Sequence, residues 1–268
     1  MASQKSFDYH SMLIFRKDYF NPRRLFEDHI PGCVNTWDDW HLIPTSRPVF
    51  AYPERKEKII DIPGSNGILD LSKSLTDYTM YKNREGTLEF IVANHQWPSW
   101  IDANSEIANF LSDEEFCIVL LDDLSYFYEG TLEASDWKSN NDGTWSNITL
   151  KYNLYPYKMY ILSTGDDWLW DPFNFETGII NTEEFKDIRV DGFKNVHFYN
   201  DAMPVVPEFY FHPTETEMTV TSRGYTITCP ANWITTKKDP RLYLKPGENT
   251  IEIHGSGVVT IDFRMGRL

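Results

Sequence analysis

Alternating apolar and polar residues dominate the first half of the chain and predict β-strands. The clearest case is residues 145–155, where Ile148, Leu150, Tyr152 and Leu154 fall on one face. Further strands are expected at 87–92, 115–121 and 126–132. One short helix is expected at 105–111, where Ile107, Phe110 and Leu111 share a side and Asp102 precedes as a cap.

A second block of short strands fills the last part of the chain. Strands are expected at 196–199, 209–211, 218–220, 225–229, 241–244, 250–253 and 258–263. Turn residues separate several of them, at 222–224, 246–249 and 255–257. Gly255-Ser256-Gly257 is expected to be a hairpin turn and not a phosphate loop, because it joins two strands. Strands at this close spacing predict an antiparallel sandwich.

The fold class that follows is mainly β, in two domains. Residues 1–165 form an N-terminal barrel-like or sandwich-like domain with the short helix, and residues 166–268 form the C-terminal sandwich. Between them lies an aromatic stretch without a clean period, interpreted as a connector that pins one block to the other through Trp168, Trp170, Phe173 and Phe175. Residues 1–35 have no assigned role.

Residues 55–75 predict a projecting arm. Pro63-Gly64 and Asn66-Gly67 are strong turn signals. Apolar residues flank them, so the segment is expected to be an extended hairpin outside the core. Such residues need a partner surface, and the predicted inter-subunit contacts are Ile62, Pro63, Gly64, Gly67, Ile68 and Leu69.

The net charge of the chain limits the classes of partner that it is expected to bind. The net charge is −15, from 40 acidic and 25 basic residues. A nucleic-acid-binding protein normally needs a basic surface to displace counterions, and an anionic membrane would repel this chain. No run approaches 18 apolar residues and no apolar segment follows the first residues, so neither a membrane span nor a signal peptide is expected. Synthesis in the cytoplasm follows.

No pattern of catalytic or metal-binding residues stands out, so no enzyme activity, cofactor or metal is expected. The cysteines, Cys33, Cys117 and Cys229, form no CxxC pair, and Cys117 lies in an apolar run typical of a core. No HExxH, GxSxG or Gly-rich phosphate motif occurs. Glycoside hydrolysis needs two carboxylates facing across a cleft, which adjacent pairs do not demonstrate: Asp38-Asp39, Asp122-Asp123 and Asp166-Asp167.

The aromatic fraction of 15% leaves one alternative open. Aromatic side chains suit a β-sheet core, but exposed Trp residues on a sandwich also stack on sugar rings. A carbohydrate-binding module is therefore the second hypothesis, with Trp97, Trp100 or Trp233 as candidate platforms.

Three segments in order resemble the distal tail protein (Dit) family of siphophages. They are Thr36–Pro44 leading into Arg47-Pro48, the arm Asp61–Leu71 with its PGxxGxLDL pattern, and Tyr81–Phe90, in which Arg84 leads an alternating strand. Tyr126–Gly130 and the connector continue the likeness. In the last block, Leu244–Ile251 and Gly255–Ile261 are similar to the family's galectin-like second domain, although the galectin His-x-Asn-Pro-Arg signature is missing.

The resemblance implies a structural virion protein at the tail tip and no catalysis. Family members form hexameric rings at the distal end of a long non-contractile tail, joining the tail tube to the baseplate. The implied partners are further copies of the chain, the tail tube protein, the tail-associated lysin or spike base, and receptor-binding proteins docked on the outer domain. Genome DNA would pass through the ring without specific binding, which an acidic wall favours. A galectin-like fold does not by itself imply sugar binding.

Overall fold

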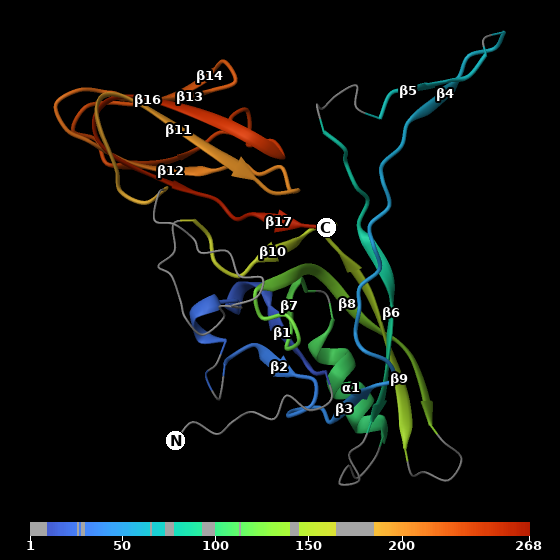
Figure 1. The fold of residues 1–268 in the computed structure, drawn as a ribbon. Helices are drawn as coiled ribbons and strands as arrows, with labels where there is room; N and C mark the ends of the chain where they lie inside the picture. The colour runs from blue at the N-terminus through green and yellow to red at the C-terminus, as the bar shows by residue number, and fades with distance from the viewer. Residues whose placement is uncertain are drawn as a thin grey trace. The chain divides into compact units, whose positions relative to one another are not determined.

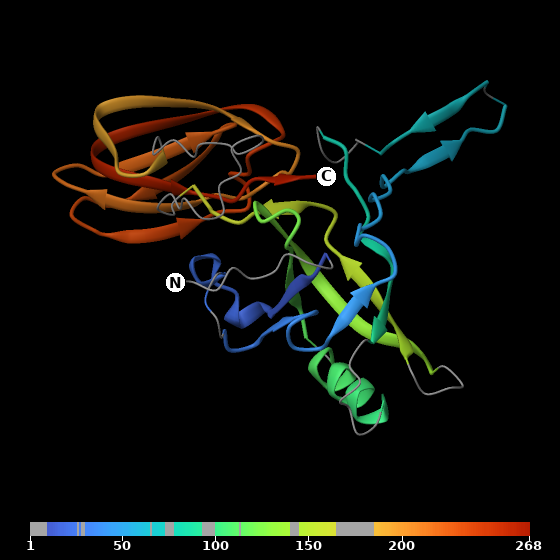
Figure 2. The same ribbon diagram turned by 60° about the horizontal axis from the view of Figure 1, so that its bottom comes forward.

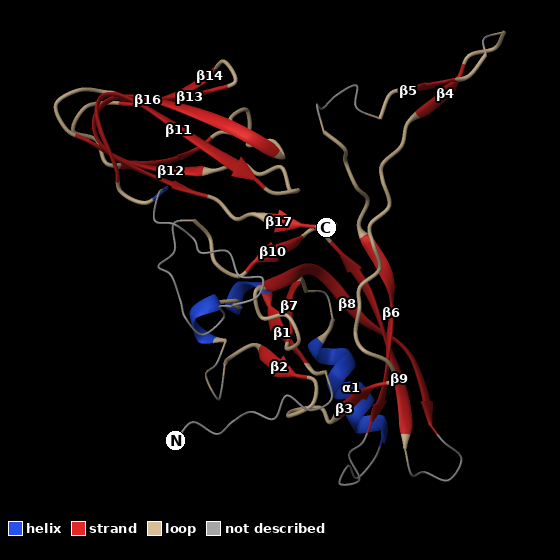
Figure 3. Cartoon of the chain, viewed as in Figure 1, coloured by secondary structure: helices blue, strands red, loops and turns tan. Residues whose placement is uncertain are grey.

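The computed structural model describes residues 10–25, 27, 30–64, 66–72, 78–92, 100–112, 114–139, 145–164 and 185–268. These residues form two compact units. The first contains Met1–Ile59 and Met80–Lys158, and the second contains Ile60–Thr79 and Met159–Leu268. Strands dominate both, and α1 (Trp100–Phe110) is a short helix among them (Figure 3). The prediction of a mainly β chain is confirmed.

The first unit is a strongly curved sheet with the strand order β2-β1-β7-β8-β9-β6-β3 (Figure 1). Neighbouring strands are antiparallel. Their bounds are β1 Met12–Arg16, β2 Cys33–Asn35, β3 Leu42–Pro44, β6 Arg84–Val92, β7 Phe116–Leu120, β8 Tyr126–Ser139 and β9 Ser146–Leu154. The two end strands, β2 and β3, follow each other in sequence and are joined by the turn 36–40, so the sheet is a nearly closed barrel.

Within residues 1–35, which had no assigned role, β1 and β2 belong to this sheet. β1 pairs with β2 on one side and with β7 on the other. The signal is present in Met12-Leu13-Ile14-Phe15, an apolar run whose members are 5% exposed or less. A strand buried on both faces is a continuous apolar run without alternation. Two short 3-10 helices, η1 (Lys17–Tyr19) and η2 (Pro22–Arg24), follow β1.

The predicted alternation of β9 is confirmed. Ile148, Leu150 and Leu154 are fully buried and Tyr152 is 3% exposed, while the intervening residues are exposed or half-buried. The same face of the sheet is covered by Ile107 and Leu111 at the end of α1. The helix itself begins at Trp100, five residues before the expected start. Asp102 therefore lies in its first turn, where a carboxylate favours the helix dipole, and does not cap it.

The second unit is built around one long strand, β16 (Gly247–Asp262). β11 (Ile188–Asn200) pairs along it from Gly247 to Val259. On the opposite edge, β13 (Met218–Ser222) pairs with residues 252–254, and β12 (Glu208–Pro213) pairs with residues 257–262. β14 (Tyr225–Cys229) lies outside β13, and β15 (Thr235–Lys238) lies outside β12. Figure 2 shows these strands in two layers. Two short strands, β10 (Lys158–Tyr160) and β17 (Gly266–Arg267), pair with each other.

Two expectations for this unit are wrong, and one strand was not predicted. Gly255-Ser256-Gly257 is not a hairpin turn, because it lies inside β16 and bends that strand where β13 and β12 separate. Residues 241–244 form no strand; Leu244 makes an isolated bridge with Val205. β15 was missed because Thr235–Lys238 is polar, as suits an edge strand with one solvated side.

Candidate assembly surface

The predicted arm is present as a two-stranded hairpin. β4 (Ile59–Asp61) pairs with β5 (Ile68–Asp70). Gly64 lies at φ +85° and Gly67 at φ +89°, in the left-handed region that favours glycine, so the turn depends on both. Figures 1 and 2 show the hairpin as a thin ribbon.

The hairpin exposes aliphatic side chains along its length. Exposed fractions are 48% for Ile59, 41% for Ile60, 45% for Ile62 and 45% for Leu69. An isolated two-stranded ribbon is marginally stable in water, and exposed aliphatic residues grouped on one element mark an interaction surface. The exposed aliphatic residues of the arm therefore form a candidate contact surface for a partner. The side chain of Ile68 lies outside the described part.

Residues 54–56 and 80–82, here called the stem, pair with each other as an antiparallel ribbon. Lys56 donates its backbone N–H to the Met80 carbonyl at 2.9 Å, and the Lys82 N–H donates to the Glu54 carbonyl at 2.8 Å. The Lys82 ammonium also pairs with the Glu54 carboxylate at 2.9 Å. This hydrogen bond lowers the pKa of Glu54 and raises that of Lys82. Backbone hydrogen bonds at the ion pair and next to it hold the two stem strands together.

Arg84 holds the root of the stem. Its side chain is 3% exposed, with Nε donating to the Pro156 carbonyl at 2.8 Å and Nη1 donating to the Ala51 carbonyl at 2.9 Å. The guanidinium carbon lies 5.7 Å from the ring centroid of Tyr128. The backbone N–H of Ala51 in turn donates to the Tyr152 hydroxyl at 2.9 Å. One buried cation thereby fixes the residue at which the chain leaves the barrel for the stem.

Burial lowers the pKa of the Arg84 guanidinium, because desolvation penalises the charged form. Burial likewise raises the pKa of the Tyr128 hydroxyl. Nη2 of Arg84 is buried and has no hydrogen-bond partner among the described residues. The sequence gives Arg84 a place in the family likeness, but its role at the stem root depends on carbonyl positions that no local pattern encodes.

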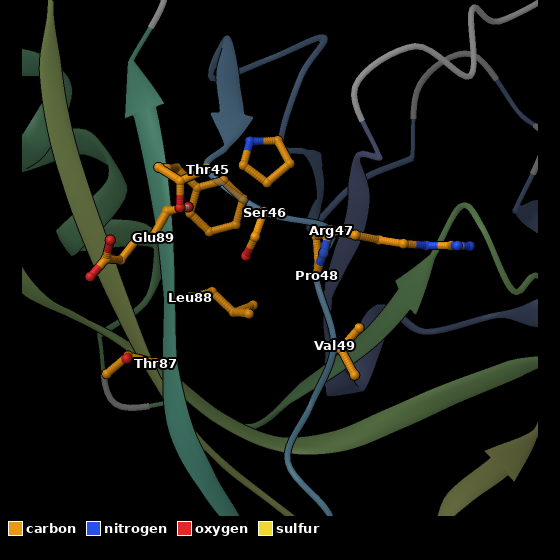
Figure 4. Close-up of a pocket in the computed structure, with 10 residues that line it drawn as sticks. Thr45, Ser46, Arg47, Pro48, Val49, Thr87, Leu88 and Glu89 are labelled. Carbon is orange, nitrogen blue, oxygen red and sulfur yellow. Dashed lines mark hydrogen bonds between the residues drawn. The ribbon is translucent and has the colours of Figure 1, made fainter.

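A small pocket of about 220 Å³ opens beside β6, where residues 45–49 part from that strand (Figure 4). The Thr45 N–H donates to the Glu89 carbonyl at 2.9 Å just before the chains separate. Figure 4 shows Leu88 and Val49 reaching toward the hollow, whereas the Arg47 side chain extends away from it. Arg47 pairs with Asp122 at 2.9 Å. Polar residues make up much of the lining, with Thr45, Ser46, Thr87 and Glu89 beside Leu88 and Val49.

The acidic pairs act within the fold. Asp39 accepts the Asn35 backbone N–H at 2.7 Å, and Asp38 accepts from the Asn35 amide at 2.8 Å, which stabilises the turn that closes the barrel. Asp122 pairs with Arg47 and with His10, and Asp123 pairs with Lys158. Asp166-Asp167 lies outside the described residues. The described pairs therefore do not form the facing carboxylates that glycoside hydrolysis needs.

The structure describes only some of the remaining candidate residues from the sequence analysis. In the described ranges, no three His, Cys, Asp or Glu side chains gather to hold a metal ion. No helix among those residues is long and apolar enough to cross a membrane. Trp233 is 64% exposed. Trp97, the side chain of Trp100 and the predicted connector lie outside the described part, the connector residues being Trp168, Trp170, Phe173 and Phe175.

No protein-family model and no curated protein matches the sequence. Solved structures similar to it include the crystal structure of SPP1 Dit (gp 19.1), described as a paradigm of the hub adsorption apparatus in phages that infect Gram-positive bacteria. That chain has a TM-score of 0.49 and 15% identity, with 85% of this chain and 94% of that one covered.

Two structures of the phage P2 baseplate in its activated conformation are also similar. The structure with Sr has a TM-score of 0.40 at 7% identity, and the one with Ca has 0.38 at 9% identity; each comparison covers 97% of this chain and 98% of that one. The SPP1 chain is a Dit protein, the family that the resemblance in the sequence named. At these scores, the chain's own residues carry the functional inference that follows.

Proposed function

We propose that this chain is a structural subunit that forms a ring at the distal end of a long non-contractile phage tail. The ring, of six copies, joins the tail tube to the tail tip and the receptor-binding apparatus. The observation that carries this proposal is the arm: a hairpin with four exposed aliphatic residues, placed where the sequence carries the PGxxGxLDL pattern. The virion tail tip is the proposed location, and the chain is proposed to have no enzymatic activity.

The arm suits a closed ring for a geometric reason. In a ring each subunit contacts its neighbour through two different patches, one of which reaches out to the other. A hairpin on a clamped stem is such a reaching element. Residues 1–165 are the proposed ring-forming domain and residues 166–268 the outer galectin-like domain, linked through the aromatic connector. The proposed partners are the tail tube protein, the tail-associated lysin or spike base, and receptor-binding proteins.

The test is the molar mass of the purified chain and two variants by light scattering. Ile60→Asp combined with Leu69→Asp places two charges on the arm, where burial against a neighbour would be costly. Wild type is expected at six times the chain mass and the double variant at the monomer mass. Ile234→Asp, at an aliphatic residue that is 70% exposed in the second unit, is the matched control and should keep the ring.

Two outcomes would contradict this proposal. Wild-type chain that stays monomeric at high concentration and high salt would contradict ring formation by the chain itself. A ring that survives both arm substitutions would remove the arm from the interface. Circular dichroism of each variant separates lost assembly from lost folding.

A carbohydrate-binding module is the second candidate, favoured by the exposed Trp233 indole. Titration with a glycan array, comparing wild type with Trp233→Ala, tests it. Binding that requires Trp233, together with a monomeric mass, would favour this function over the ring.

A further inference from the structure

Two of the edge strands of the sheet in the second unit are β14 and β15. The strand order is β14-β13-β16-β12-β15, and within the described residues β14 pairs with β13 and β15 with β12. The two edges follow each other in the chain, joined by residues 230–234. Each edge strand presents backbone N–H and C=O groups on its outer side, which is a template for another strand.

The outer sides of these strands face one groove, here called the edge groove. Residues 226–228 of β14 and residues 236–239, at β15 and just beyond, line a space of about 440 Å³. The Lys237 ammonium crosses it and donates to the Thr228 carbonyl. A groove-side carbonyl of β14 is therefore bonded to a flexible side chain and not to a neighbouring strand.

Positive charge lines the edge groove. Within the described part of the chain, no carboxylate forms an ion pair with Lys237 or Lys238. The nearby carboxylate of Asp239 is held by Arg241, with Nη2 at 2.7 Å and Nε at 3.0 and 3.2 Å. In a chain of net charge −15, two unpaired lysines beside two edge strands make a local site for an anionic strand.

The loop that joins β14 to β15 exposes two large apolar side chains. Trp233 and Ile234 are 64% and 70% exposed in the connecting loop. The Cys229 thiol donates to the Trp233 carbonyl at 3.1 Å, which fixes the loop against β14. Three exposed threonines, Thr226, Thr228 and Thr236, complete a surface suited to cross-strand pairing.

We propose that the edge groove binds an extended acidic segment of another protein, which adds as a strand along β14. The incoming N–H replaces the Lys237 ammonium on the Thr228 carbonyl, and the carboxylates of the segment pair with Lys237 and Lys238. Main-chain bonds supply affinity and the lysines supply selectivity. The proposal rests on the proposed function in one respect, that the other protein is a tail component.

Synthetic peptides titrated into the full chain by calorimetry test this. The probes are a peptide of alternating Thr and Glu, its counterpart with Lys in place of Glu, and a copy of the first with alternate backbone amides N-methylated. The acidic peptide is expected to bind roughly tenfold or more tightly than either other peptide. The Lys peptide loses the charge-assisted bonds, and the N-methylated peptide loses main-chain hydrogen bonds. Lys237→Gln with Lys238→Gln should weaken it by a similar factor, whereas Lys194→Gln, at an exposed lysine of β11, should not.

Equal binding of the N-methylated peptide would overturn strand addition, and equal binding of the Lys peptide would overturn the acidic preference. Self-association lost on Lys237→Gln with Lys238→Gln, without peptide, would assign the groove to a second copy and overturn the proposal. Failure of the edge-groove proposal can be distinguished from failure of the ring proposal, because peptide binding and molar mass are separate measurements on the same chain.

Discussion

Arg84 shows how a single buried cation sets the geometry of the arm. Its described partners are neutral: two carbonyl oxygens and the face of Tyr128. Buried charge is costly unless its hydrogen bonds are made, so the site keeps the chain at Ala51 and at Pro156 in place. The residue type is readable from the sequence, but the two carbonyls are 33 and 72 positions away.

Arg84→Ala should therefore lower the free energy of unfolding by about 3 kcal/mol, since hydrogen bonds from a charged group are each worth about 1.5–3 kcal/mol. Arg84→Lys should lose less, because an ammonium can keep one of the two bonds. Urea unfolding measures both. Arg55→Ala, at an exposed arginine of the stem, is the control and should change stability little. Equal effects at the two positions would contradict the role given to Arg84.

The Asp239–Arg241 pair predicts a pH dependence. Hydrogen bonds from the Arg241 side chain and backbone N–H lower the pKa of Asp239 from its ordinary 3.8 to about 2. A lowered pKa in the folded state stabilises the protein fully above pH 3.8, and that contribution disappears as the pH falls toward 2. The difference in unfolding free energy between wild type and Asp239→Asn should be constant above pH 3.8 and shrink below it. A difference that is constant down to pH 2 would contradict this assignment.

At the scale of elements, the bend in β16 is fixed by close backbone approach. Gly257 has φ +149°, and a Cβ there would lie 2.4 Å from the His212 carbonyl oxygen. Gly255 is similarly close to the Glu217 carbonyl. The bend lets β13 and β12 leave the same edge of β16, which in turn places β14 and β15 on either side of the edge groove.

Gly257→Ala should destabilise the second unit by about 2–4 kcal/mol, because both backbone strain and a clash must be relieved. Gly192→Ala is the matched control: its φ is +84°, but nothing lies within 4 Å of the added methyl. The control variant should suffer the backbone strain without a clash. Its loss of stability, measured by thermal unfolding, should therefore be smaller. Equal losses would show that close approach to His212 is unimportant.

The acidic residues in the turn at 36–40 have a structural role that the sequence pattern does not show. Asp38-Asp39 stands out in the sequence as a pair of acids, yet both carboxylates accept hydrogen bonds from Asn35. Short polar side chains commonly satisfy local backbone groups in turns. The turn matters because it joins β2 and β3, which lie at the two ends of the strand order in the sheet. Only the tertiary structure shows this.

At the scale of the whole molecule, the charge of −15 opposes self-assembly. Like charges on neighbouring copies repel over about 30 Å at 0.01 M salt and about 3 Å at 1 M salt. If the arm drives ring formation, raising the salt should increase the fraction of ring, because the apolar contact persists while the repulsion is screened. Light scattering across this range measures it. Dissociation of the ring by added salt would indicate an interface held by ion pairs and would contradict an aliphatic clasp.

The same charge predicts how the chain treats DNA. Duplex DNA should show no mobility shift with this protein even at low salt, because few cations are available to replace counterions. Single-stranded DNA serves as a second probe. Binding of either that weakens with salt would contradict an inert passage for the genome.

By itself, the sequence determined the β class, the face of β9 that is buried, the arm hairpin and the charge of the chain. These follow from short-range periodicity, turn residues and composition, which act within a few positions of each other. The tertiary structure decided the closure of the barrel, the Arg84 clamp, the continuity of β16 through Gly255–Gly257 and the meeting of β14 with β15 at one groove. Those features depend on pairings between distant residues, whose geometry is set by packing and not by local preference.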